Sequence, residues 1–244
     1  MMHRLEINRV SKVFRIGSMK DQGALSKVLS MISGKEHREK IIVLRDISFH
    51  VTRGECVGLI GDNGTGKSTL MRILAGIYPQ TGGEVKVCGN IVPIIGLGSG
   101  FQMRLTMKDN IYLAGSLFNM SRRTIREKFD SIVSFAELDD FIHTKLFQFS
   151  EGMRQRLAFS IAIHSHPDIL LMDEVFEVGD QRFRKKSSEK IKELVDKGTS
   201  VLLVSHELWM IEKHCERSIW LKDGRVYMDG PTPSILSQYR KISA

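Results

Sequence analysis

The chain alternates short apolar runs with amphipathic segments, and these two patterns predict strands and helices in turn. Residues 5–10 alternate apolar and polar side chains, as a half-buried strand does, and residues 42–49 lead into a second strand. Residues 56–60, 169–172 and 200–204 are nearly continuous apolar runs, which is the pattern of strands buried on both faces of a parallel sheet. Because these runs alternate with helical patterns, the sequence predicts an α/β fold with helices on both faces of a parallel sheet.

Helical periodicity predicts a mostly helical lobe in the middle of the chain. Residues 107–117 and 121–135 have one apolar and one charged face each, and Ser121 is a favourable N-cap for the second helix. Residues 150–163 read as a further helix. Near the end, Asp223-Gly224 indicates a hairpin turn, and residues 231–239 predict a closing helix begun by proline.

Residues 15–40 form an unusual insertion, rich in Lys, Ser and Gly, between the first two predicted strands. Within it, apolar side chains fall at helical spacing, which predicts a short amphipathic helix, and they are Leu25, Val28, Leu29 and Ile32. Such a helix either covers the core of its own domain or lies at a membrane surface. Periodicity alone leaves both readings open.

Composition sets wider limits. The chain has 244 residues and a formal net charge of +8, which is compatible with a nucleotide, a nucleic acid or an anionic membrane surface as ligand. It contains no apolar run of the roughly 20 residues that cross a bilayer and no apolar signal segment at its start, so we expect a cytoplasmic protein. Cys56, Cys88 and Cys215 have no metal-like spacing, and we expect reduced thiols to which we assign no chemistry.

A phosphate-binding loop follows the buried strand at residues 56–60. Residues 61–68 fit the pattern G-x-x-x-x-G-K-[ST] and precede a helical segment. The backbone N–H groups of such a loop curl around phosphate oxygens, the lysine reaches the β and γ phosphates, and the serine hydroxyl is placed to bind Mg²⁺. We therefore expect ATP and Mg²⁺ as ligands, held by Gly61, Asp62, Asn63, Gly64, Thr65, Gly66, Lys67, Ser68 and Thr69.

Two acids end the apolar strand at residues 169–172. Asp173 is suited to holding Mg²⁺ and Glu174 to orienting or deprotonating the attacking water, because phosphoryl transfer depends mainly on positioning and charge neutralisation. Both carboxylates emerge at the carboxyl edge of the sheet, where open α/β sheets bind ligands. An Asp-Glu pair after a strand is by itself also the pattern of an ordinary solvated turn.

The order of these segments resembles the ATP-binding subunits of ABC transporters over nearly the whole chain. Residues 149–158, Phe-Ser-Glu-Gly-Met-Arg-Gln-Arg-Leu-Ala, are similar to the family signature, and Ser205-His206 is similar to its switch segment. The resemblance implies a P-loop NTPase of the ABC ATPase fold, with a RecA-like parallel-sheet core, an antiparallel β portion and a helical subdomain. It implies a single domain over residues 1–244, with the helical lobe at about residues 103–165.

The resemblance also implies roles for residues outside the phosphate loop. In the family, two copies enclose two ATP molecules, so Ser150 and Gly152 are expected to meet the γ-phosphate on the opposite subunit, and His206 to contact the γ-phosphate beside Glu174. Phe14 stands at the position of the aromatic residue that stacks on adenine, although core packing is an alternative for it. Asp180, which closes the segment after the acidic strand, is also placed at the nucleotide. We assign no role to Gln102, since residues 96–101 depart from the usual family pattern before it.

Three departures from the general family pattern resemble the subgroup that exports O-antigen, capsule and teichoic acid chains. They are Phe-Ser-Glu-Gly-Met at residues 149–153, Gly-Ser-Gly-Phe at residues 98–101 and Asp-Glu-Val-Phe-Glu-Val-Gly-Asp at residues 173–180. The subgroup often carries an insertion before the second strand, as this chain does at residues 15–40. It implies export of a lipid-linked glycan, without the further carbohydrate-binding domain that some relatives have.

The implied partners are a second copy of the chain and two copies of an integral membrane permease, through which the glycan is reached. The implied location is the cytoplasmic face of a bacterial inner membrane. Two alternatives remain open. One is the ATPase of a drug or small-molecule exporter, and the other is a soluble ABC protein acting on ribosomes or DNA, which the basic charge permits. We expect no nucleic acid partner, because such proteins usually fuse two cassettes or carry long coiled coils.

Overall fold

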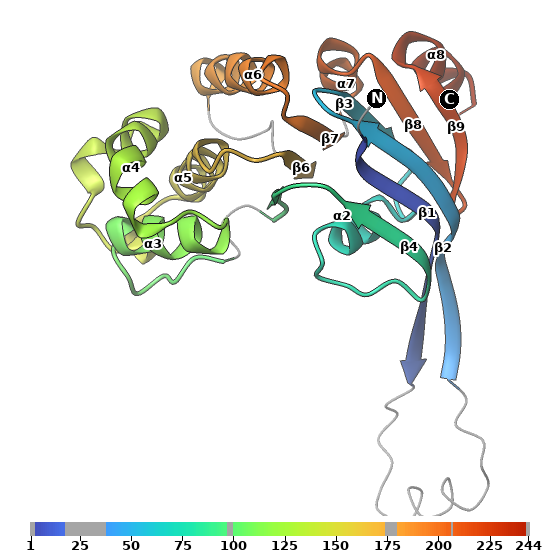
Figure 1. The fold of residues 1–244 in the computed structure, drawn as a ribbon, viewed down its shortest axis with the longest axis horizontal. Coiled ribbons are helices and arrows are strands. Elements are labelled where there is room, and N and C mark those ends of the chain that lie inside the picture. Colours follow the sequence, from blue (N-terminus) through green and yellow to red (C-terminus); the bar gives the residue numbers. More distant parts are fainter. Residues whose placement is uncertain (1–2, 18–37, 97–99, 174–179, 206, 243–244) are drawn as a thin grey trace, which may run out of the picture.

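The computed structural model describes residues 3–17, 38–96, 100–173, 180–205 and 207–242. Within them, a large sheet and a small sheet lie together at one side of the molecule, and a group of helices lies at the other (Figure 1). The predicted amphipathic helix with Leu25 and Leu29 lies outside the described residues. None of the helices in the described ranges is long and apolar enough to cross a membrane.

The large sheet has six strands in the order β5-β6-β7-β3-β8-β9. Five of them run parallel, and β9 pairs antiparallel with β8. The strands are β3 (Cys56–Ile60), β5 (Ile91–Ile94), β6 (Ile169–Asp173), β7 (Ser200–Val204), β8 (Arg217–Lys222) and β9 (Arg225–Pro231).

Both faces of this sheet are covered, which explains its continuous apolar runs. Successive residues of a strand point to opposite faces, and in β3 Ile60 joins one core cluster while Leu59 joins the other. The first cluster is completed by side chains from α5 (Glu151–His164), α6 (Gln181–Asp196), α7 (Leu208–His214) and α8 (Thr232–Ile242). The second is completed by α2 (Lys67–Leu74) and the small sheet.

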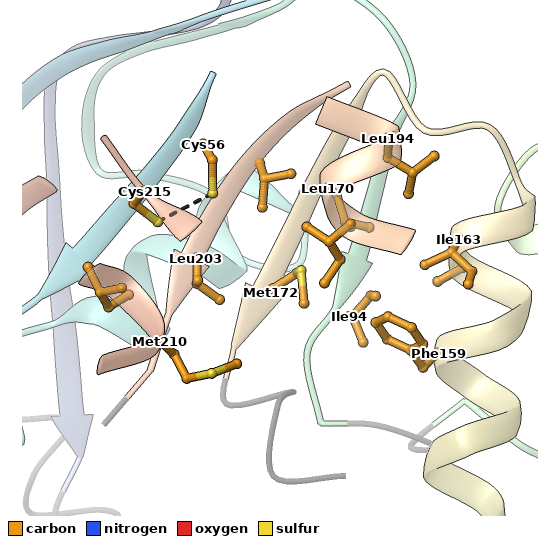
Figure 2. Packing of buried hydrophobic residues seen from close by; sticks show 14 of the residues in the cluster. Cys56, Ile94, Phe159, Ile163, Leu170, Met172, Leu194, Leu203, Met210 and Cys215 are labelled. Carbon is orange, nitrogen blue, oxygen red and sulfur yellow. Dashed lines mark hydrogen bonds between the residues drawn. The ribbon is translucent and has the colours of Figure 1, made fainter. Parts of the chain in front are cut away.

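The first cluster brings two cysteines together that are far apart in sequence. Figure 2 shows Cys56 at the start of β3 facing Cys215, which follows α7, with their sulfur atoms 3.3 Å apart. Both thiols are buried, and both are free. The hydrogen bond with Cys56, together with burial, raises the pKa of the Cys215 thiol well above its ordinary value, so this thiol stays protonated at neutral pH.

The small sheet is antiparallel, in the order β2-β1-β4. Its strands are β1 (His3–Gly17), β2 (Arg38–Thr52) and β4 (Gly82–Val87). β1 and β2 are far longer than the predicted segments 5–10 and 42–49, and their ends at Gly17 and Arg38 project beyond the other described elements (Figure 1).

The helical lobe contains α3 (Met107–Leu117), α4 (Arg122–Ala136) and α5, joined by the short helices η1 (Asp139–Phe141) and η2 (Leu146–Gln148). These elements enclose a third core cluster that includes Met107, Ile132 and Leu157. The predicted N-cap at Ser121 is confirmed, because its side-chain oxygen accepts a hydrogen bond from the backbone N–H of Thr124 at 3.1 Å.

The predicted fold class is confirmed, and of two predicted features near the end of the chain one is confirmed and one differs. The predicted hairpin at Asp223-Gly224 joins β8 to β9, with both residues at positive φ. The closing helix does not begin at Pro231, however, because that residue still pairs with Arg217 as the end of β9, and α8 begins at Thr232.

Candidate nucleotide site

The phosphate-binding loop connects β3 to α2 at the carboxyl edge of the large sheet. Gly66 directly precedes α2 with φ +100°, in the left-handed region that favours glycine. A Cβ atom there would lie 2.6 Å from the Leu44 side chain and 3.1 Å from the Val43 carbonyl oxygen. The loop therefore packs closely against β2 as well as against its own sheet, and the small sheet fixes its position.

Lys67 is held inside this loop. Its side chain is 7% exposed, and its Nζ donates hydrogen bonds to the carbonyl oxygens of Gly61 at 2.6 Å and Asp62 at 2.9 Å. Thr65 Oγ1 also donates to the Asp62 carbonyl oxygen, at 2.8 Å. These bonds close the loop into a compact turn with the ammonium group at its centre.

The start of α2 offers hydrogen-bond donors to an anion. No side chain caps this helix, because its N-cap is Gly66, and its first N–H groups have no partners within the helix. The uncapped end carries a partial positive charge that favours phosphate. Ser68 and Thr69 lie in this first turn and are half-buried.

Asp173 lies at the same edge of the sheet. Strand pairing sets it level with Val204 of β7, and Val204 level with Leu59 of β3, two residues before Gly61. Adjacent strands are about 4.8 Å apart, so the backbones at Asp173 and Leu59 are roughly 10 Å apart. Glu174 and His206 lie outside the described residues, and their predicted roles remain predictions.

Phe14 lies near the loop, on β1. Lys12 pairs with Leu44, the residue that contacts Gly66, and Phe14 is two residues further along the strand. The half-buried Phe14 ring makes an edge contact with Tyr78 at 5.8 Å between centroids, and the Lys12 ammonium lies 4.8 Å from the Phe14 ring centroid. An aromatic surface thus stands beside the loop, and stacking of adenine on it remains a prediction.

Ser150 and Gly152 lie at the start of α5, in the helical lobe. Ser150 is the N-cap of this helix, and its Oγ accepts a hydrogen bond from the Met153 N–H at 3.2 Å. A Cβ atom at Gly152 would meet nothing within 4 Å, so the backbone of the signature segment is open to an incoming group. Its contact with a nucleotide on a second copy stays a prediction.

Two further sequence positions have local roles in the structure. Asp180 caps α6, since its Oδ1 accepts a hydrogen bond from the Phe183 N–H at 2.9 Å, and its predicted place at the nucleotide is untested. Gln102 exchanges backbone hydrogen bonds with the buried Asn110 side chain, at 2.8 Å and 3.1 Å, and its own side chain has no assigned role.

Sequence reasoning missed one contact of the phosphate loop. Tyr239 of α8 donates a hydrogen bond from its hydroxyl to the Asp62 carboxylate at 2.8 Å, across 177 positions of sequence. Nothing in the periodicity of residues 231–239 connects that helix with the loop, and only the fold brings the two residues together.

The fold and this loop are those of a P-loop nucleotide-binding domain, and comparison with known sequences gives the family. Residues 44–177, more than half of the chain, match the ABC transporter family. The chain therefore belongs to the ABC transporter family.

Individual relatives are similar over most of the chain. It is 37% identical over 219 residues to the O-antigen export system ATP-binding protein RfbB of Myxococcus xanthus, covering 88% of this chain and 50% of the relative. It is 40% identical to the teichoic acids export ATP-binding protein TagH of Lactococcus lactis, covering 89% and 47%. It is 38% identical to an O-antigen export system ATP-binding protein of Klebsiella pneumoniae, covering 84% and 83%. The chain thus spans about half the length of the first two relatives.

Solved structures support the fold. An ATP-binding subunit of an ABC transporter superposes with a TM-score of 0.77 at 24% identity, covering 97% of this chain and 93% of the other. An ATP-binding cassette described as a dimer in a post-hydrolysis state with ADP and Pi superposes with a TM-score of 0.75 at 24% identity, covering 93% and 98%. Both are α/β cassettes of the same architecture.

Proposed function

We propose that this chain binds and hydrolyses ATP as the ATP-binding subunit of an ABC transporter that exports a lipid-linked cell-surface polysaccharide. The observation that carries the ATPase part is the loop between β3 and α2. This loop contains both the Lys67 ammonium group and the uncapped start of α2. The glycan part is supported by the relatives, which are named for O-antigen and teichoic acid export.

The residues at the sheet edge have the chemistry that Mg²⁺ requires. Mg²⁺ prefers oxygen ligands and usually keeps several waters. The Ser68 hydroxyl in the first turn of α2 and the Asp173 carboxylate at the end of β6 supply such oxygens on the phosphate side of the sheet. Magnesium bound there would neutralise part of the phosphate charge.

Within this proposal, the protein groups have distinct tasks. The loop N–H groups and Lys67 bind and orient the β and γ phosphates, which makes the γ-phosphate available for in-line attack. Glu174 orients or deprotonates the attacking water, and His206 contacts the γ-phosphate beside it. Ser150 and Gly152 of a second copy complete the site through the open start of α5.

Closure of two copies around ATP and reopening after hydrolysis would move two copies of a membrane permease at the cytoplasmic face of the bacterial inner membrane. In energetic terms, ATP shifts the population toward the closed dimer and hydrolysis releases it.

Residues 15–40 are the candidate segment for contact with the membrane or the permease. Leu25→Asp with Leu29→Asp tests this, since unchanged transport by a folded double variant would exclude the contact.

The ATPase part is tested with two variants of purified protein. Glu174→Gln should keep Mg-ATP binding but lose nearly all turnover, whereas Lys67→Ala should weaken nucleotide binding itself. ATP binding by calorimetry and phosphate release give both quantities. Normal turnover in Glu174→Gln would contradict the role of that residue, and a wild-type protein without Mg-ATP binding would contradict the whole proposal.

The transport part is tested by affinity purification from membranes. A copurifying integral membrane subunit, and ATPase activity stimulated by a lipid-linked glycan, are the expected results. Stimulation by small hydrophobic compounds alone would favour a drug exporter, and purification free of any membrane subunit would favour a soluble ABC protein.

A further inference from the structure

The C-terminal helix α8 contacts the phosphate-binding loop through one side chain. The Tyr239 hydroxyl donates a 2.8 Å hydrogen bond to Oδ1 of Asp62, the second residue of the loop. Asp62 also supplies one of the carbonyl oxygens that hold the Lys67 ammonium. A residue near the end of the described chain therefore reaches the residue that helps to position the phosphate-binding lysine.

The Tyr239 ring packs against the core cluster on the α8 side of the large sheet. It meets the Trp220 ring edge-on, with centroids 5.1 Å apart and an interplanar angle of 88°. Trp220 belongs to β8 and is 1% exposed, so the tyrosine packs on a side chain of the core. The contact of its ring with Trp220 orients the Tyr239 hydroxyl toward the loop.

This contact lies on the opposite face of the large sheet from α2. Tyr239 and Trp220 belong to the core cluster on the α7 and α8 side, whereas Leu70 of α2 belongs to the cluster on the other face. The hydrogen bond thus holds the Asp62 carboxylate toward α8, whereas α2, whose first turn is the candidate phosphate site, packs on the other face.

The electrostatic consequence follows from the charges involved. A carboxylate within the phosphate loop repels a triphosphate and attracts the lysine ammonium that the triphosphate needs. A hydrogen bond from a neutral hydroxyl restrains the carboxylate without adding charge. If this restraint were lost, the carboxylate could turn to Lys67 and compete with the γ-phosphate for its ammonium group.

Resting on the proposed function, we propose that Tyr239 is a positioning residue of the nucleotide site, which keeps the Asp62 carboxylate on α8 and so keeps Lys67 available to ATP. In this role it acts through its hydrogen bond to Asp62. Its removal weakens ATP binding, and saturated turnover stays unchanged.

The test compares four forms of the full chain: wild type, Tyr239→Phe, Asp62→Asn and the double variant. The Kd of a non-hydrolysable β,γ-imido ATP analogue with Mg²⁺ is measured by calorimetry, and KM and kcat for ATP by phosphate release. Tyr239→Phe should raise Kd and KM by about three- to tenfold, which corresponds to the net contribution of one ordinary hydrogen bond, with kcat unchanged. In the double variant, Kd should return to within about twofold of the Asp62→Asn value, because no carboxylate remains to be restrained.

Tyr227→Phe is the matched control. This tyrosine also contacts Trp220, with ring centroids 4.7 Å apart, and it is 50% exposed. Its substitution should leave Kd and KM at wild-type values. Thermal unfolding of all forms measures any loss of stability separately.

Two results would overturn the inference. One is a Tyr239→Phe variant with wild-type Kd, and the other is a double variant as weak as Tyr239→Phe, which would make the effect a general loosening of α8. If the wild type itself binds no Mg-ATP analogue, the proposed function fails first, and the inference fails with it.

Discussion

Arg217 of β8 and Asp229 of β9 are joined by two parallel hydrogen bonds, from Nε to Oδ1 and from Nη2 to Oδ2, each 2.7 Å long. The same guanidinium donates to Glu55 at 3.0 Å and to the His50 carbonyl oxygen at 3.1 Å. It thereby ties the large sheet to the small one at the edge opposite the phosphate loop. The hydrogen bonds that the guanidinium donates to Asp229 are the largest cause that raises the pKa of Arg217, against the opposing effect of burial.

Removal of this guanidinium should destabilise the protein. Arg217→Ala leaves two carboxylates without their shared cation. Loss of one partner of a partly buried charge pair should lower the free energy of unfolding by about 2–4 kcal/mol. Urea unfolding of Arg217→Ala measures the loss. Arg240→Ala is the control, because its ion pair with Glu212 has side chains 55% and 50% exposed and should contribute about 0–1 kcal/mol. Equal losses in the two variants would contradict the role of the Arg217 network.

Glu55 should make stability depend on acid pH. Burial alone raises its pKa, but hydrogen bonds from the Thr52 backbone and side chain and from Arg217 outweigh burial and lower the pKa below the ordinary value of 4.5. The unfolded chain therefore binds a proton more readily, so this carboxylate stabilises the fold fully above about pH 4.5, and the contribution is lost as pH falls through the folded-state pKa.

Glu55→Gln tests this expectation. The free energy of unfolding should fall by about 1–2 kcal/mol at pH 7, and the difference from wild type should shrink toward pH 3. Glu84→Gln, at a carboxylate 62% exposed, controls for the simple loss of a charge. A difference that stays constant from pH 7 to pH 3 would show that Glu55 does not act through its ionised form.

Ser150 should have two separable effects. As N-cap of α5 it accepts a hydrogen bond from Met153, just as Ser121 does from Thr124 at the start of α4. Ser150→Ala and Ser121→Ala should each cost about 1 kcal/mol of stability. Only Ser150→Ala should also lower ATPase activity, since only that serine lies in the signature segment. Equal activity in the two variants would leave Ser150 with its capping role alone.

The cysteines should differ in reactivity. Cys56 and Cys215 are buried and Cys88 is half-buried, and thiol alkylation requires an exposed thiolate. Iodoacetamide at pH 7.5 should modify Cys88 alone in the folded protein and all three residues in urea, which mass spectrometry of the peptides reads directly. Rapid modification of Cys215 in the native state would mean that the core around it opens readily.

The elements that could be predicted from the sequence are those whose pattern depends only on neighbouring residues. The strand at residues 56–60 was recognised because both of its faces are buried, and Ser121 because capping leaves a local signature. The length of β1 was missed, since register shifts interrupt its pairing between Ile7 and Val10 and again near Lys12, and each shift breaks the two-residue alternation. β4 was missed because its glycines and exposed side chains form no apolar pattern.

The same distinction applies to the residues of the candidate site: those within a local motif could be recognised from the sequence, and contacts between distant elements could not. The phosphate loop could be read from residues 61–68 because its glycines and lysine are contiguous, and Asp173 because it ends a buried strand. The bond between Tyr239 and Asp62 could not be read, since it depends on how α8 crosses the sheet. The meeting of Cys56 with Cys215 depends on strand order in the same way.

The long hairpin of β1 and β2 has a mechanical consequence. Outward from Leu44, which lies against Gly66, β1 and β2 pair as far as Gly17 and Arg38, with one register shift between Lys12 and Val13. The six residues from Leu44 to Arg38 span roughly 20 Å of extended strand. Because β2 contacts the phosphate-binding loop at Gly66, we expect a displacement of the far end of this two-stranded ribbon to be transmitted to that loop.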